Sequence, residues 1–398
     1  MSVRPRETGD LTRGTAPGSR GAAVAVGSVF ATNGMLVGAY AGVLAALTVR
    51  LGIEAATVAV LLLTVGTAAV VSMQVGGRLA DRLGARGVAI WSLPVMALGA
   101  LVVGVATTFP VVLVGGALLG LGNGATDVSM NAVGVEVEKA RATPVMSRFH
   151  AFWSLGSFVG AGIVLVAAQL VDRGLLVPTA LLSAVALSML TLAVTARWVP
   201  VTAPVDHVVD GVRTPIPRAA WLLGAMAVCF GLMEGTAFDW SSIHVTQVAH
   251  VDPGTGAAGL VVVTVFMVAM RLLGDAAVTR FGHHLVVRGG AVVSAVGYTV
   301  TAFTTPLPVV LLGWALVGFG VAMIAPQVYA AAGHLGGGRM LAVVVTFGYA
   351  AFLAGPAILG WLVHTVGVQH AMLLPLVLAF ALVVIARWMP AVVPSGSG

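Results

Sequence analysis

Twelve apolar runs, most of them close to twenty residues long, constrain this chain more than any other feature of its sequence. A helix needs about 20 apolar residues to cross the hydrocarbon core of a bilayer. When the runs are cut at Arg, Asp, Pro and Gly clusters, they predict transmembrane helices at 22–48, 57–79, 87–107, 110–134, 148–170, 175–196, 218–241, 257–279, 286–304, 307–333, 340–363 and 369–388. The sequence therefore predicts an all-α membrane protein whose main partner is the lipid bilayer.

The composition excludes several other classes of protein. Hydrophobic residues make up 59% of the chain and charged residues 9%, whereas soluble domains carry roughly 25% charged residues. A soluble enzyme or a secreted disulfide scaffold is therefore excluded. The net charge of +6 would normally suggest nucleic acid as a partner, but the positive charges lie in short segments between apolar runs, so we expect no nucleic-acid partner.

Neither cysteine nor histidine usage indicates a redox or metal site. The single cysteine, Cys229, lies in an apolar run and cannot form an internal disulfide. His283 and His284 are adjacent but too few to bind a metal, and we expect them in a loop. We therefore predict no bound metal and no cofactor.

The distribution of Lys and Arg predicts the orientation in the membrane. If the N-terminus is cytoplasmic, seventeen basic residues fall in inner segments and only Arg50 and Arg173 in outer loops, while Arg271 lies within a span. An excess of this kind on the cytoplasmic side is the usual topology signal. We expect a multi-pass protein of the cytoplasmic (inner) membrane with both termini in the cytoplasm. Residues 1–20 are polar and lack the apolar stretch of a signal peptide, so we expect a cytoplasmic tail.

A polar, proline-containing stretch divides the predicted helices into two sets of six. The predicted organisation is an N-terminal bundle over 21–197, a cytoplasmic linker over 198–217, a C-terminal bundle over 218–389 and a tail over 390–398. The two halves also resemble each other 198 residues apart: Ala117-Leu-Leu-Gly-Leu-Gly122 aligns with Ala315-Leu-Val-Gly-Phe-Gly320. A repeated six-helix unit is typical of transporters whose site lies between the halves.

The segment after the second predicted helix carries a known signature. It reads Gly77-Arg-Leu-Ala-Asp81-Arg82-Leu-Gly84-Ala85-Arg86 and resembles the cytoplasmic loop signature of the major facilitator superfamily, with Ala85 at one usually basic position. The resemblance implies two pseudo-symmetric six-helix bundles and transport by alternating access. It also implies that Gly77, Asp81, Arg82, Gly84 and Arg86 act in gating.

Further stretches look like a branch of bacterial permeases related to fucose–proton symporters. They are Asp127-x-x-x-Asn131, Phe149-His-Ala-Phe-Trp-Ser-Leu-Gly156, Glu234-Gly-x-x-x-Asp239-Trp240-Ser241, Arg271-Leu-Leu-Gly-Asp275 and Tyr349-x-x-Phe-Leu-x-Gly-Pro356. Many members of that branch have no assigned substrate, so the resemblance names none.

Asp127 is the strongest candidate for proton coupling. A charge at mid-bilayer is costly, so an acidic residue within a span requires an explanation. Asn123, Asp127 and Asn131 recur every four residues and share one helix face. A carboxyl in a partly dry cavity can load a proton on one side and release it on the other. The competing interpretation is an Asp that only holds neighbouring helices together.

Other polar residues within the predicted helices are candidates with open alternatives. Glu234 is a second proton-coupling candidate. The candidates for substrate binding are Asn33, Asn123, Asn131, Asp239, Gln327 and Tyr349, although Asp239 could be interfacial and Asn33 could bridge helices. Arg271 and Asp275 are either a local ion pair or a pair that breaks during gating. His150 lies at a helix start, where packing and gating are equally compatible with its position.

These observations predict a secondary transporter. The favoured interpretation is proton-coupled symport of a small polar, sugar-like solute by a monomer. The alternative is a proton-driven antiporter that exports a drug-like compound; the Gly-Pro signature of many exporters is missing from the fifth predicted helix. An enzyme is not expected, since no catalytic motif such as His-Glu-x-x-His or Gly-x-Ser-x-Gly occurs.

Overall fold

The computed structural model describes residues 15–141, 145–202 and 216–390, and within these ranges almost the whole chain is helical. The helices are α1 (Arg20–Leu51), α2 (Ala55–Leu83), α3 (Ala85–Val105), α4 (Phe109–Arg141), α5 (Met146–Leu170), α6 (Leu176–Thr195), α7 (Arg218–Val248), α8 (Pro253–Gly256), α9 (Ala258–Phe303), α10 (Leu307–Val321), α11 (Ile324–Ala371) and α12 (Leu373–Ile385). Short 3₁₀ turns lie at Arg173–Leu175, Ala196–Trp198 and Ala386–Trp388.

The two longest helices each contain more than one membrane crossing. In α9 the backbone turns at Gly282, where φ is 77°, and α11 contains the end of one candidate span, at Leu335, and the whole of the next, Val343–Ala371. Eleven described segments are long and apolar enough to span a membrane, and a shorter apolar helix follows at Leu373–Trp388. The predicted all-α membrane fold with twelve crossings is therefore confirmed, with the last crossing shorter than the others.

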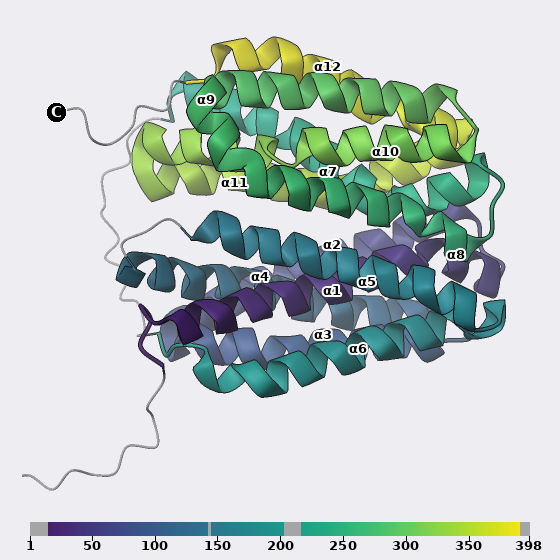
Figure 1. Ribbon diagram of the computed structural model, residues 1–398, viewed down its shortest axis with the longest axis horizontal. Coiled ribbons are helices and arrows are strands. Elements are labelled where there is room, and N and C mark those ends of the chain that lie inside the picture. Colours follow the sequence, from purple (N-terminus) through teal and green to yellow (C-terminus); the bar gives the residue numbers. More distant parts are fainter. Residues whose placement is uncertain (1–14, 142–144, 203–215, 391–398) are drawn as a thin grey trace, which may run out of the picture.

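The crossings form two bundles that lie side by side (Figure 1). Helices α1 to α6 form the N-terminal bundle, and α7 to α12 form the C-terminal bundle. We call the face at which α1 begins the Arg-rich face; it carries Arg20, Arg78, Arg82, Arg86, Arg141, Arg148, Arg197, Arg218, Arg280, Arg288 and Arg387. We call the opposite face, with Arg50 and Arg173 near α8, the Arg-poor face.

The internal repeat is reproduced in the packing of the helices. A Cβ atom on Gly120 of α4 would lie 2.2 Å from the carbonyl oxygen of Val65, and a Cβ on Gly318 of α10 would lie 2.3 Å from that of Val263. Gly120 and Gly318 are 198 residues apart in the sequence, and so are Val65 and Val263. The same spacing relates Gly84 and Gly282, whose φ angles of 88° and 77° only glycine adopts readily. The predicted pseudo-symmetry is thus confirmed at the level of backbone contacts.

Glycines also allow α1 and α5 to pack closely. A Cβ on Gly38 would lie 2.1 Å from the carbonyl oxygen of Ser157, and one on Gly160 would lie 2.1 Å from that of Met35. Small residues at helix crossings are typical of membrane proteins, because close backbone contact replaces the missing hydrophobic drive.

Several predicted boundaries are wrong. The segment Gly77–Arg86 is not an extended loop: α2 runs to Leu83, α3 begins at Ala85, and Gly84 alone connects them. Helix α4 continues seven residues beyond the predicted end at 134, to Arg141. His283 and His284 are helical rather than in a loop. The apolar pattern marks the part of a helix in the hydrocarbon core, whereas helices extend into the polar region, where no hydropathy signal distinguishes them.

Candidate functional site

Polar side chains from both bundles meet near the middle of the membrane-spanning helices. They come from α1, α4 and α5 on one side and from α7, α9 and α11 on the other. Because charged and polar groups are costly at this depth, their contacts show how each one is stabilised.

Asp127 joins the two bundles through a hydrogen bond. The Tyr349 hydroxyl of α11 donates to Oδ2 of Asp127 on α4 at 2.9 Å, although the residues are 222 positions apart. Asn131, one turn along α4, donates to the Asp127 carbonyl oxygen at 2.8 Å and to Oδ1 at 3.3 Å. Three predicted site residues therefore lie together, and Asp127 has a partner across the interface.

Asn33, Asn123 and Trp153 form a second group inside the N-terminal bundle. Asn33 donates to Oδ1 of Asn123 at 3.0 Å, and its own Oδ1 accepts from the Trp153 indole N–H at 2.8 Å. The Trp153 ring also packs against Phe238 of α7, with ring centroids 5.3 Å apart. Asn33 is only 1% exposed, and its amide groups are engaged, so it acts as a brace in this conformation.

Glu234 and Arg271 form a buried ion pair that also reaches across the interface. Nη2 of Arg271 lies 3.1 Å from Oε1 of Glu234, and the two side chains are 10% and 11% exposed. Nη1 of Arg271 donates to the Ser154 hydroxyl of α5, and Nε lies 3.5 Å from the carbonyl oxygen of Ala322. The guanidinium thus connects α7 and α9 of one bundle with α5 of the other.

Asp275 was predicted to pair with Arg271, but its side chain lies outside what the structure describes. All three guanidinium nitrogens of Arg271 contact other groups, as shown above. His150 is exposed at the start of α5, and its ring lies edge-on to Phe30 with centroids 5.4 Å apart. His150 therefore borders the site on its Arg-rich side.

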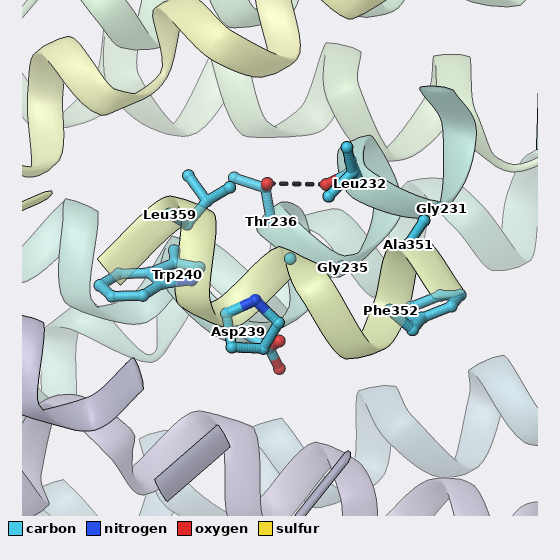
Figure 2. A pocket seen from close by; sticks show the side chains of 11 residues that line it. Gly231, Leu232, Gly235, Thr236, Asp239, Trp240, Ala351, Phe352 and Leu359 are labelled. Atoms are coloured by element: carbon cyan, nitrogen blue, oxygen red, sulfur yellow. Dashed lines mark hydrogen bonds between the residues drawn. The ribbon is translucent and has the colours of Figure 1, made fainter. Parts of the chain in front are cut away.

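Asp239 and Gln327 lie away from the central group. Asp239 lines a small cavity between α7 and α11, next to Trp240 and Pro356 (Figure 2). The oxygen Oε1 of buried Gln327 lies 2.5 Å from Nδ1 of His283, both in the C-terminal bundle. Among the described residues, neither Asp239 nor Gln327 forms a hydrogen bond with Asp127 or Asn123.

The signature segment packs against the end of its own bundle. The N–H of Ala85 donates to the Thr202 hydroxyl at 2.7 Å, and Arg86 reaches the carbonyl oxygen of Ala196 at 3.5 Å. Gly84 leaves no space for a side chain, since a Cβ would lie 2.6 Å from the carbonyl oxygen of Thr202. Gly77, Asp81 and Arg82 lie in the last two turns of α2, and Asp81 interacts with a neighbouring group.

The bundles are in direct contact at the Arg-poor face. A Cβ on Gly360 of α11 would lie 2.0 Å from Cβ of Ala59 on α2. Glu54 and His364 lie 3.9 Å apart across the same boundary, beside an open pocket of about 340 Å³. This side of the interface is therefore closed by close packing.

Trp153 and Ser154 were not singled out by the sequence analysis as site residues. Both lie within the stretch Phe149–Gly156, which resembles the permease branch. The resemblance marked this stretch but assigned no role to either residue. Their roles follow from partners on α1 and α9 that no local pattern reveals.

Twelve crossings in two repeated bundles, with buried carboxyls between the bundles, are typical of membrane transporters. The family model described as Major Facilitator Superfamily matches residues 24–332. The chain belongs to this superfamily and is a transporter, not an enzyme.

Similar proteins are themselves transporters without an assigned substrate. The chain is 31% identical to the uncharacterized transporter y4wD of Sinorhizobium fredii over 351 residues, which covers 85% of this chain and 90% of that protein. It is 30% identical to an uncharacterized MFS-type transporter of Yersinia pestis over 338 residues, which covers 84% and 86%.

Solved structures share the fold at low sequence identity. The nucleoside transporter NupG matches with a TM-score of 0.72 at 14% identity, covering 92% of this chain and 98% of that one. FucP, solved in the outward conformation, matches with a TM-score of 0.61 at 15% identity and the same coverage. These similarities show the fold.

Proposed function

We propose that this protein is a proton-coupled symporter that carries a small polar solute across the cytoplasmic membrane, with its Arg-rich face in the cytoplasm. The observation that supports this proposal best is the placement of its two central carboxyls. Asp127 is bonded to Tyr349 on the opposite bundle, and Glu234 is connected to Ser154 of the opposite bundle through Arg271.

Partners across the interface link charge to conformation. A carboxylate accepts a hydrogen bond or an ion pair more strongly than a neutral carboxyl does. Protonation therefore weakens contacts that hold the bundles together, while deprotonation strengthens them. Alternating access requires such a link, since a ligand shifts an equilibrium only through differential interactions with the two states.

The groups around the carboxyls fit a small polar solute. Asn123, Asn131, Trp153 and Tyr349 are partly exposed within the interface. Amides form hydrogen bonds with hydroxyl groups, and aromatic rings pack against the apolar faces of sugar or base rings. NupG, a nucleoside transporter that shares the fold, makes nucleosides the first solutes to test, together with the sugars suggested by the sequence resemblance to fucose–proton symporters. Both carboxyls and their partners belong to one chain, so we propose that a monomer suffices.

Electrical recording on proteoliposomes tests this proposal. Proton symport of a neutral solute moves charge, so a panel of sugars and nucleosides should contain at least one that evokes a current into the liposomes. Asp127→Asn should abolish the current while the protein still folds and inserts. The control is Asp172→Asn, the same conservative change at an exposed residue of the Arg-poor face.

An undiminished solute-evoked current in Asp127→Asn would remove that carboxyl from the mechanism. If protons instead move against the solute, the current reverses and the exporter interpretation replaces the symporter.

A further inference from the structure

The same three-residue sequence, Ala-Arg-Trp, follows the last helix of each bundle at the Arg-rich face. It occurs at Ala196–Trp198 after α6 and at Ala386–Trp388 after α12, and both copies form a 3₁₀ turn. In each copy the N–H of the residue after the Trp donates to the carbonyl oxygen of the Ala, at 3.2 Å and 3.1 Å. We call these segments the Ala-Arg-Trp turns; they lie 190 residues apart.

In both turns the arginine side chain stacks on the neighbouring tryptophan. Cζ of Arg197 lies 4.4 Å from the ring centroid of Trp198, and Cζ of Arg387 lies 4.8 Å from that of Trp388. Trp198 is 36% exposed and Trp388 is 60% exposed. A guanidinium is planar and its N–H groups point outward within that plane, so stacking on a ring leaves them able to bind an oxyanion.

The described residues leave donors of both arginines available. Nε of Arg387 donates to the carbonyl oxygen of Val384 at 2.9 Å, which leaves the two Nη groups for another acceptor. Among the described residues, no acidic side chain forms an ion pair with Arg197 or Arg387. At the first turn, Nη2 of Arg86 lies 3.5 Å from the carbonyl oxygen of Ala196, which brings a second positive charge to the same place.

Each turn lies at the end of a row of exposed apolar side chains. The α6 row is Leu187, Leu190 and Val194, and the α12 row is Val377, Phe380 and Val384; all six are between 42% and 62% exposed. Spacings of three and four residues place each row on one helix face. Corresponding members of the rows are 190 residues apart, like the turns. Figure 1 shows α6 and α12 along opposite outer edges of the two bundles.

An anionic phospholipid matches both parts of this arrangement. Arginine binds a phosphate group through paired N–H groups, and the apolar row matches an acyl chain. Tryptophan is favoured at the boundary between hydrocarbon and water, where the phosphates of a bilayer lie. We propose that each Ala-Arg-Trp turn binds the phosphate of an anionic phospholipid at the Arg-rich face, with an acyl chain along the adjoining row.

Native mass spectrometry of the purified, delipidated full-length protein tests this proposal. Phosphatidylglycerol should fill two sites at concentrations at which phosphatidylcholine with the same acyl chains binds weakly. Arg197→Gln and Arg387→Gln should each weaken one site about fivefold, the usual contribution of one arginine near a charged lipid surface. Arg20→Gln removes the same charge at an exposed position of the same face, outside both turns, and should leave both sites intact.

Two further comparisons separate the stacked pair and the acyl chain from charge alone. Trp198→Leu should weaken the first site, whereas Trp198→Phe retains a ring and should weaken it less. Inorganic phosphate and glycerol phosphate should not displace the lipid at equal concentration, because they lack acyl chains.

Equal binding of the two lipids, or full binding in the double variant Arg197→Gln with Arg387→Gln, would overturn the proposal. An equal loss in Arg20→Gln would reduce the effect to net charge, and displacement by inorganic phosphate would make the turns sites for a free anion; either result contradicts a lipid site. The measurement needs neither a transported solute nor a pH gradient, so its failure leaves the proposed symport untouched.

Discussion

Glu234 and Arg271 stabilise each other as a buried pair of opposite charges. Removing one member leaves the other charge buried without a partner, which costs about 3–5 kcal/mol. We therefore expect Glu234→Gln alone to reduce the yield of folded protein strongly, since the other partners of Arg271 among the described side chains and backbone groups, Ser154 and the carbonyl oxygen of Ala322, are neutral. The double variant Glu234→Gln with Arg271→Met should fold better than Glu234→Gln, yet lack solute-evoked current.

Gel filtration in detergent and the recovered yield of monodisperse protein measure this difference. If the double variant folds no better than Glu234→Gln, the unpaired charge of Arg271 is not the cause of the lost stability. Normal current in the folded double variant would exclude both residues from coupling.

Single residues of the site could be proposed from the sequence because acidic and amide residues are conspicuous in apolar runs. The residues with which they form hydrogen bonds and ion pairs could not be predicted in the same way. Tyr349 lies 222 residues from Asp127 and Arg271 lies 117 residues from Ser154, and only the docking of the bundles brings them together. For Arg271 the sequence suggested only its neighbour Asp275, whose side chain lies outside what the structure describes, and the structure adds Glu234 of another helix as a partner.

Helix positions and the repeat were predictable because each depends on local or periodic signals. Apolar runs placed the crossings, and the glycines at Gly84 and Gly282 appeared at equal positions in both halves. The connection between α2 and α3 was misjudged, because Arg78 and Asp81 appeared to end the helix. Charged residues are compatible with a helix that has left the hydrocarbon core, so they do not mark its end.

Contact between α2 and α11 closes the Arg-poor face, and Gly360 is the residue that permits it. We expect Gly360→Leu to push the helices apart, since even a Cβ would lie 2.0 Å from Ala59. In a Cys229→Ala background, a cysteine placed at buried Val363, which lines the pocket on this face, should react faster with a water-soluble maleimide in Gly360→Leu.

Gly162→Leu is the matched control, because a Cβ at Gly162 meets nothing within 4 Å. Equal labelling rates in Gly360→Leu and Gly162→Leu would contradict the idea that this contact keeps the face closed.

Asp252 gives α8 a dependence on pH. Burial alone would raise the pKa of Asp252, but the hydrogen bonds from Thr255 and from backbone N–H groups outweigh it and hold the pKa below its usual value. A lowered pKa in the folded state contributes stability above the pKa of the unfolded state, about 3.9, and that stability is lost as pH falls through the folded pKa.

The acid-dependent part of the stability should therefore shrink in Asp252→Asn. Asn is a comparable N-cap without a charge, so this variant should lose less Tm than the unmodified protein between about pH 5 and about pH 3. Identical Tm losses would show that Asp252 contributes no acid sensitivity.

At the scale of the whole molecule, the account requires that opening at one face accompanies closure at the other, and that the charge of Asp127 and Glu234 controls the balance. The repeat supplies matched reporters. Val105 and Phe303 are exposed near the Arg-poor face, and Leu83 and Phe281 are exposed near the Arg-rich face; each pair is 198 residues apart and joins the two bundles.

Distances between spin labels at these two pairs, in a Cys229→Ala background, test the central claim most directly. Between about pH 5 and about pH 8, the distance populations at the two faces should change in opposite directions, and the triple variant Asp127→Asn, Glu234→Gln and Arg271→Met, which leaves no unpaired charge at Arg271, should remove the dependence on pH. Distances that do not change with pH, that change in the same direction at both faces, or that respond equally in the triple variant would contradict the claim.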